Sequence, residues 1–60
     1  MEILCKKASK RHKGMFIVLV RRDEGAFPYV TWVADSEGHF YYGHYFASRD
    51  EAIRDFAERS

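Results

Sequence analysis

The fold is decided by Gly38-His-Phe-Tyr-Tyr-Gly-His-Tyr-Phe-Ala-Ser-Arg-Asp-Glu-Ala-Ile-Arg-Asp-Phe-Ala-Glu-Arg-Ser60, which joins an aromatic strand to an amphipathic helix with almost no linker. Ser48 and Glu51 have the spacing of a capping box, in which the serine hydroxyl accepts a hydrogen bond from the backbone N–H three residues later. Apolar residues then recur at helical spacing: Ala52, Ile53, Phe56 and Ala57. This pattern predicts a helix over about 49–59 with one buried stripe.

Charged residues occupy the other side of this helix. Asp50 precedes Arg54 by four residues, and Asp55 precedes Arg59 by the same distance. Acid-before-base pairs at this spacing are neighbours on the surface of a helix and stabilise it. We therefore interpret this side as a solvated surface rather than a binding site.

A tight turn at Asp35-Ser-Glu-Gly38 separates two strand-like runs, over about 29–35 and 39–46. Aspartate suits the first position of a type I turn, and glycine suits the position that needs a positive φ. The pattern predicts a β-hairpin with a loop over Ser36–Gly38. Ala34 then pairs with Phe40 and Trp32 with Tyr42, so that even-numbered side chains share one face.

The two faces of this hairpin differ in polarity. The more apolar, even-numbered face consists of Val30, Trp32, Ala34, Phe40 and Tyr42. We expect the helix to cover this face with Ile53 and Phe56. The odd-numbered face is aromatic but hydroxylated, which suggests partial exposure. Its members are Tyr29, Thr31, Val33, Tyr41 and Tyr45.

Another strand is expected over about 15–22, a run of β-branched and aromatic residues without alternation, which is typical of burial on both faces. Met1 to Cys5 is either a short extra strand or a disordered start. The expected fold is α+β: a three-stranded antiparallel sheet with one C-terminal helix packed on one face. We expect a single domain over 1–60 in which 1–13 is a flexible basic segment.

The chain has more apolar side chain than this fold can bury. It has ten aromatic residues, and a chain of this length hides only about 60% of its unfolded surface. The surplus predicts a homodimer or another protein partner at the odd-numbered, uncovered face, with Tyr29, Thr31, Val33, Tyr41 and Tyr45 as candidate contacts. The alternative is that Met1 to Leu4 folds back over this second face.

Charge is distributed unevenly along the chain. Residues 1–22 carry seven cations against one acid, a net +6, whereas residues 23–60 carry three against eight, a net −5. The cations are Lys6, Lys7, Lys10, Arg11, Lys13, Arg21 and Arg22. Such a cluster attracts phosphates without reading sequence, and Arg21 and Arg22 on a strand are the ones placed to touch bases. The alternative is a mobile, solvated loop.

Other classes of function find little support in the sequence. No apolar run approaches the ~20 residues of a membrane span, and the single cysteine, Cys5, suits a reducing, cytoplasmic compartment. His39 and His44 are expected on opposite faces of the sheet, so we expect no metal and no cofactor. No nucleophile has a predictable base, and a deep pocket is not expected in so short a chain. We therefore expect neither an enzyme nor a small-molecule substrate.

One pattern at the strand-to-helix junction consists of Trp32-Val-Ala34, Tyr42-Gly43, Phe46, Ser48 and Glu51-Ala52. It resembles the AP2/ERF-type DNA-binding domain over about half of the chain, and it is also similar to the HicB group and other small families with three strands and a helix. The AP2/ERF resemblance implies a sheet that contacts the major groove through arginine and tryptophan. The second and third strands lack arginine here, which leaves Arg21 and Arg22.

Two hypotheses follow from these patterns. The first is a small non-enzymatic module for protein–protein interaction or homodimerisation through the uncovered aromatic face. The alternative is a weak nucleic-acid-binding protein that uses the basic N-terminal segment and the first strand. We favour the first because the apolar surplus concerns the whole chain.

Overall fold

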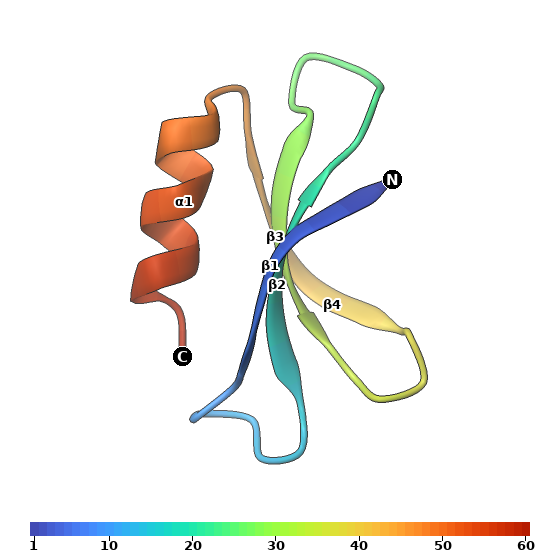
Figure 1. The fold of residues 1–60 in the computed structure, drawn as a ribbon, viewed down its shortest axis with the longest axis vertical. Helices are drawn as coiled ribbons and strands as arrows, with labels where there is room; N and C mark the ends of the chain where they lie inside the picture. The colour runs from blue at the N-terminus through green and yellow to red at the C-terminus, as the bar shows by residue number, and fades with distance from the viewer.

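The computed structural model describes residues 1–60 as a curved antiparallel sheet and one helix (Figure 1). In chain order the elements are β1 (Glu2–Ala8), β2 (Phe16–Arg21), β3 (Tyr29–Ala34), β4 (Phe40–Phe46) and α1 (Arg49–Glu58). The strands lie in the sheet in the order β1-β2-β3-β4, and each neighbouring pair is antiparallel. The fold class is therefore α+β. Its one helix is too short and too polar to cross a membrane.

The sheet has four strands, so the expected three-stranded sheet is wrong. In the pairing of β1 with β2, Cys5 lies opposite Leu19 and Lys7 lies opposite Ile17. β2 is apolar on both faces and therefore lies inside the sheet, where both of its edges need hydrogen-bonding partners. Lys6 and Lys7 are part of this edge strand. They made the segment 1–13 look like a flexible basic tail.

The helix covers the odd-numbered face of the sheet, which is the opposite of the expected face. Beneath it, Thr31 is 0% exposed and Val33 is 1% exposed. The stripe that faces the sheet has the spacing i, i+3, i+4, i+7 and consists of Ala52, Asp55, Phe56 and Arg59. Ile53 lies outside this stripe and is 38% exposed. The stripe contains two charged residues, which is why its position differs from the apolar pattern.

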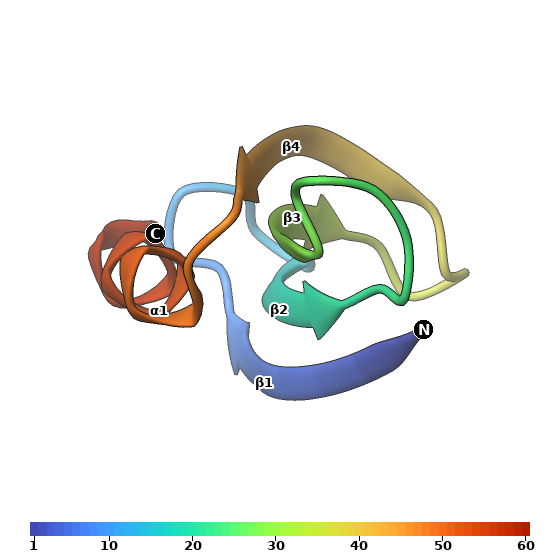
Figure 2. The same ribbon diagram turned by 90° about the horizontal axis from the view of Figure 1, so that it is seen from above.

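The even-numbered face forms a second small core without the helix. It consists of Val18, Val20 and Ala34, with Trp32 and Phe40 packed against them. Figure 2 shows that the N-terminal halves of β1 and β4 curl away from α1, so that the two edges of the sheet flank this face. Ile3 and Phe40 border the same groove. Part of the apolar surplus is therefore buried within the chain. This arrangement resembles the alternative in which N-terminal residues cover the second face.

The tight hairpin between β3 and β4 is confirmed. The N–H of Gly38 donates to the carbonyl of Asp35 at 3.3 Å, and the N–H of Asp35 donates to the carbonyl of His39 at 3.0 Å. Gly38 has a φ of 89°, the conformation that the turn requires. Ala34 pairs with Phe40 as predicted.

A β-bulge follows in β4, where Tyr42 and Gly43 together lie opposite Trp32. Because side chains alternate with a period of two, the extra residue moves every later side chain to the other face. Tyr45 therefore pairs with Val30 on the side away from the helix, and the expected pairing of Trp32 with Tyr42 is wrong. Gly43 is required because an added Cβ would lie 2.6 Å from Trp32 Nε1.

The start of α1 is confirmed. Ser48 is the N-cap, and its Oγ accepts the N–H of Glu51 at 3.4 Å. Asp50 and Glu51 lie in the first turn, where the helix dipole favours negative charge. The last backbone bond runs from the N–H of Arg59 to the carbonyl of Asp55 at 2.9 Å.

Candidate nucleic-acid interface

A partly buried polar network joins α1 to the centre of the sheet. Thr31 Oγ1 donates to Asp55 Oδ2 at 2.6 Å, and the same carboxylate oxygen lies 2.9 Å from His44 Nδ1. Arg59 Nη1 donates to Thr31 Oγ1 at 3.0 Å and to the Thr31 carbonyl at 3.1 Å. Polar atoms at a buried residue need such partners. The network therefore holds the C-terminal half of the helix on the sheet.

Asp55 and Arg59 are turned toward the sheet, so the interpretation of this pair as solvated surface charge is wrong. The pKa of Arg59 is lowered from its ordinary value because burial disfavours the charged guanidinium, and the charge of Asp55 opposes this shift. An arginine nevertheless remains protonated at neutral pH. The network thus brings a permanent positive charge to the end of the helix.

Hydrogen bonds hold the loop over residues 9–15. The N–H of Ser9 donates to the carbonyl of Met15 at 2.9 Å, and the N–H of Met15 donates to the carbonyl of His12 at 3.0 Å. Ser9 Oγ accepts the N–H of His12 at 2.8 Å and donates to the carbonyl of Ser60 at 2.7 Å. These hydrogen bonds hold the loop against the segment after α1. The loop is therefore not the mobile, solvated loop of the alternative interpretation.

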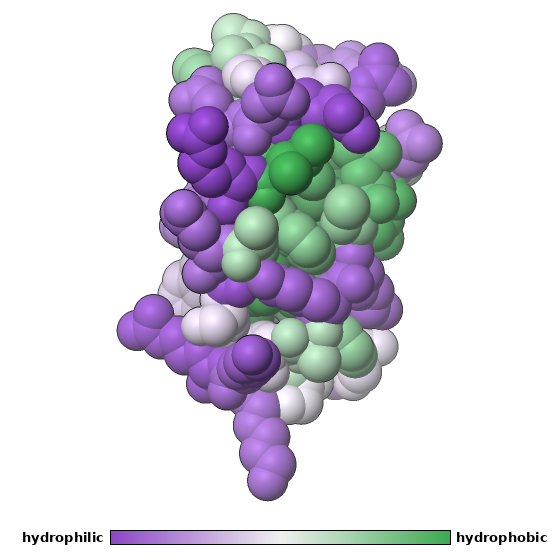
Figure 3. All heavy atoms as spheres, turned by 60° about the vertical axis from the view of Figure 1, so that its left-hand side comes forward, coloured by the Kyte–Doolittle hydropathy of each residue, from purple (hydrophilic) through white to green (hydrophobic).

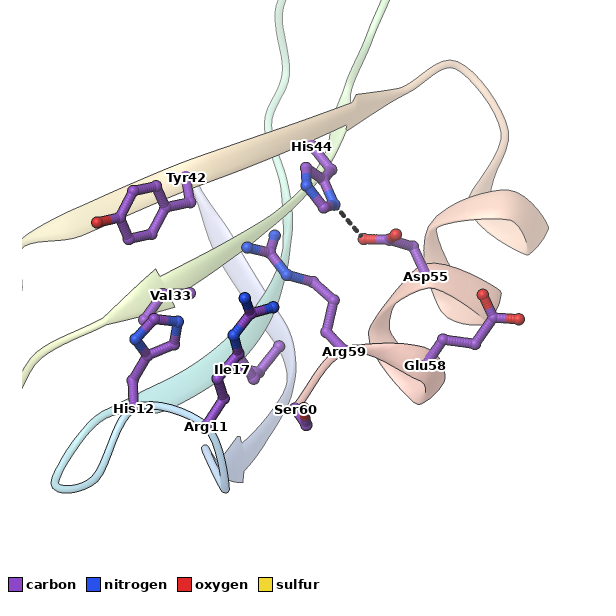
Figure 4. Close-up of a pocket in the computed structure, with 10 residues that line it drawn as sticks. All are labelled: Arg11, His12, Ile17, Val33, Tyr42, His44, Asp55, Glu58, Arg59 and Ser60. Atoms are coloured by element: carbon purple, nitrogen blue, oxygen red, sulfur yellow. Dashed lines mark hydrogen bonds and ion pairs between the residues drawn. The ribbon is translucent and has the colours of Figure 1, made fainter.

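An open cavity of about 560 Å³ lies where this loop, β4 and the end of α1 meet (Figure 4). Ile17 and Val33 provide its apolar lining. Four nitrogen-bearing side chains also line it: Arg11, His12, His44 and Arg59. Two acids are present, Asp55, which is bonded within the network, and Glu58, which is exposed. The cavity is thus polar, with a surplus of groups that can contact an anion.

Tyr42 stands beside this cavity in an unusual backbone conformation. It has a φ of 54°, the left-handed region that residues other than glycine seldom adopt. Its side chain is 69% exposed and stacks on His12, with ring centroids 5.9 Å apart and an angle of 22° between the rings. Strain of this kind persists only where the surrounding structure enforces it, and it is common at binding sites.

Two of the predicted nucleic-acid-binding cations lie beside acids. Arg21 is 3.9 Å from the carboxylate of Glu2 and 3.6 Å from that of Asp23. Arg22 is 3.6 Å from the carboxylate of Glu24. These partners offset the positive charge at the end of β2, where base contacts were expected.

Two further cations lie over aromatic rings. Lys6 Nζ is 4.3 Å from the ring centre of Phe16, and Lys7 Nζ is 4.9 Å from that of Phe56. Lys7 also donates to a carbonyl of α1 at 3.4 Å, so it helps to fasten the helix to β1. The remaining predicted cations form no ion pair and lie exposed in the loop 9–15; they are Lys10, Arg11 and Lys13.

The five candidate protein-interaction residues do not form one surface. Thr31 and Val33 are buried beneath the helix, and Tyr29 is half-buried. Tyr41 is 41% exposed and pairs with Val33, whereas Tyr45 is 51% exposed and lies on the opposite face. The bulge between the two tyrosines separates them.

Asp35 organises the exposed hairpin turn. Its Oδ1 accepts the N–H groups of His39 and Glu37, each at 2.9 Å, and its Oδ2 accepts the hydroxyl of Tyr41 at 3.1 Å. The backbone hydrogen bond from His39 is the largest cause that lowers the pKa of Asp35 to about 2. The hydrogen bond that the Tyr41 hydroxyl donates to Asp35 raises the pKa of Tyr41.

The ionised form of Asp35 should stabilise the fold. The folded-state pKa of about 2 lies below the ordinary value of 3.8, so this contribution is complete above pH 3.8 and is lost as the pH falls toward about 2. We expect wild type to have a higher urea midpoint than Asp35→Asn above pH 3.8, and the two midpoints to converge toward pH 2. A constant difference across this range would contradict the assignment.

No match to a family model, to a curated protein or to a solved structure was found for this chain. No three histidine, cysteine, aspartate or glutamate side chains lie close enough together to hold a metal ion. Cys5 is a free, exposed thiol. The function of the protein is therefore inferred from the geometry of its own residues.

Sequence reasoning missed the part that Tyr42, His44, Asp55 and Arg59 play around the cavity. Tyr42 was assigned to the face under the helix, and the two helix charges were assigned to solvent. A glycine inside a strand, Gly43, is a known sign of a bulge and could have indicated the change of face. Nothing in the sequence indicates the inward rotation of the helix charges.

Proposed function

We propose that this protein is a small non-enzymatic module that binds nucleic acid through the loop 9–15. The observation that supports the proposal is the position of Lys10, Arg11 and Lys13, which are exposed, form no ion pair and lie in a loop held by hydrogen bonds. A positioned cation loses less conformational entropy on contacting a phosphate than a mobile one does. Release of the counterions around the phosphates supplies the affinity.

The arrangement of charge supports the same proposal. The loop 9–15 lies at one end of the molecule, and the turn that contains Asp23 and Glu24 lies at the other end (Figure 1). The acids of that turn are therefore too distant to cancel the field of the loop, whereas the hairpin turn with Asp35 and Glu37 lies at the same end as the loop (Figure 1). Arg59 adds a further guanidinium to the same end, and Asp55 and the exposed Glu58 are the acids that line the same cavity.

Binding to a single-stranded oligonucleotide should therefore weaken steeply as salt rises. Each phosphate contact contributes about −0.7 to the slope of log affinity against log salt. Replacing Arg11 and Lys13 together by Ala should make the slope less steep by about 1.4 units. Fluorescence anisotropy of a labelled oligonucleotide, repeated over a series of salt concentrations, measures this slope.

A matched control is available on the helix. Arg49 and Arg54 are exposed, and replacing both by Ala changes the net charge by the same amount. We expect this variant to retain nearly the wild-type slope because these residues lie on α1 and not in the loop. Equal losses in the two variants would show a general effect of net charge, and no binding at about 50 mM salt would refute the proposal.

Homodimerisation is a second candidate function, favoured by the open edge of β1. The outer edge of β1 pairs with no strand, and Figure 3 shows a hydrophobic patch with hydrophilic side chains above it, below it and on its left. β1 carries Glu2 near its start and Lys6 near its end. An antiparallel second copy would therefore set opposite charges against each other about a two-fold axis.

Light scattering at micromolar concentration should then report about twice the chain mass of 7.1 kDa. Lys6→Glu should lower the mass because it sets two acids against each other across the two-fold axis, whereas Arg54→Glu, a charge reversal on the exposed side of α1, should leave the dimer intact. A monomer at every concentration would contradict this second candidate.

A further inference from the structure

Tyr42 adopts a strained backbone conformation at the bulge of β4, and this conformation leaves its ring exposed. An aromatic residue with a φ of 54° is strained, whereas glycine, which follows at position 43, tolerates such a conformation. The ring is 69% exposed, so it contributes little to either core. The ring stacks on the imidazole of His12, in the loop 9–15, and the ring of Tyr41 lies tilted beside it with a centroid distance of 6.3 Å.

The two rings have the geometry of an incomplete stack. Their centroids are 5.9 Å apart and their planes differ by 22°. The centroid distance includes any sideways offset of the rings, so a flat base enters between them only after they move apart. Rotation of the exposed tyrosine side chain can supply this movement without unfolding the loop.

Cationic groups surround this pair. Arg11 and Lys13 flank His12 in the sequence. In Figure 4 the guanidinium of Arg59 extends toward the sheet and lies between Tyr42 and His44. The adjoining cavity of about 560 Å³ lies in the range of small-ligand sites, about 300–1,000 Å³. A base between the rings would thus have donors for its phosphates close by.

We propose that His12 and Tyr42 bind one unpaired base between their rings, so that the protein prefers single-stranded nucleic acid to duplex. This inference rests on the proposed function, which supplies the phosphate contacts. A base inside a duplex is already stacked and paired, and its faces are closed to the two rings. An unpaired base offers both faces, and stacking of this kind accepts any base.

The test uses single-stranded oligonucleotides that contain 2-aminopurine, whose fluorescence falls when it stacks on an aromatic ring. Wild type should quench this fluorescence on binding and should bind the single strand more tightly than the corresponding duplex. Tyr42→Ala should bind the single strand about 10-fold more weakly and should lose the quenching, whereas Tyr42→Phe should retain both. The salt slope should be the same in all three because no charge is removed.

Tyr45→Ala is the matched control, since Tyr45 is an exposed tyrosine of the same strand on the opposite face. It should quench and bind as wild type does, and duplex affinity should not change in any of these variants. Salt-dependent binding without quenching, or with equal affinity for single strand and duplex, would refute the stacking of a base between the two rings. It would not affect the proposed function. Absence of any binding by wild type at low salt would overturn both.

Discussion

Leu19→Ala is expected to bring this protein close to unfolding. Leu19 is 1% exposed in the middle of β2, on the face that α1 covers, and it lies opposite Thr31 of β3. Truncating a buried leucine costs about 2–5 kcal/mol through lost burial and the cavity left behind. A domain of this length has a free energy of unfolding of only about 3–9 kcal/mol. Urea denaturation followed by circular dichroism measures the fall in midpoint.

Ile53→Ala provides the control for this experiment, because the apolar pattern of the helix assigned Ile53 to the core. In the structure it is 38% exposed, so the substitution should cost about 1 kcal/mol or less. If Leu19→Ala and Ile53→Ala lowered the free energy of unfolding by similar amounts, this would contradict the finding that Ile53 lies outside the stripe of α1 that faces the sheet. A wild-type midpoint for Leu19→Ala would contradict the placement of β2 at the centre of the sheet.

Asp55→Ala is expected to loosen the helix from the sheet. Asp55 Oδ2 takes part in contacts with both Thr31 and His44, and Thr31 is 0% exposed. Removing the carboxylate leaves the buried hydroxyl without its acceptor, which costs about 1–3 kcal/mol. Glu58→Ala removes an exposed acid from the same helix and should change the free energy of unfolding by about 0.5 kcal/mol or less.

A double-mutant cycle separates this network from a general effect of charge. Thr31→Val keeps the shape of the side chain but removes the hydroxyl that donates to Asp55. Because the two residues contact each other, the double variant should lose less stability than the sum of the single variants. Strict additivity would show that the hydrogen bond contributes nothing to the docking of α1.

The elements that could be predicted from the sequence are those whose cause is local. The hairpin turn depends on Asp35 and on the positive φ of Gly38, and the helix start depends on Ser48 three residues before Glu51. Each of these signals acts within four residues, where chain connectivity already holds the partners together. The turn and the start of the helix were therefore predicted correctly.

The fourth strand could not be settled from local signals. Residues 6–8 read as part of a basic tail, and their strand exists because β2 has an edge to satisfy. The position of the bulge at Tyr42 likewise depends on how β3 and β4 pack around Trp32. One extra residue was enough to place Tyr41 and Tyr45 on opposite faces.

By itself, the sequence determined the α+β class, the turn, the helix with its cap, and the cluster of cations before β2. Only the tertiary structure decided which face the helix covers and which cations remain free of acids. It also decided that His12, Tyr42 and Arg59 surround one cavity. The physical reason is that these features depend on residues distant in the chain: the buried hydroxyl of Thr31 bonds to Asp55 and Arg59 across 24 and 28 positions, and this pairing sets the rotation of the helix.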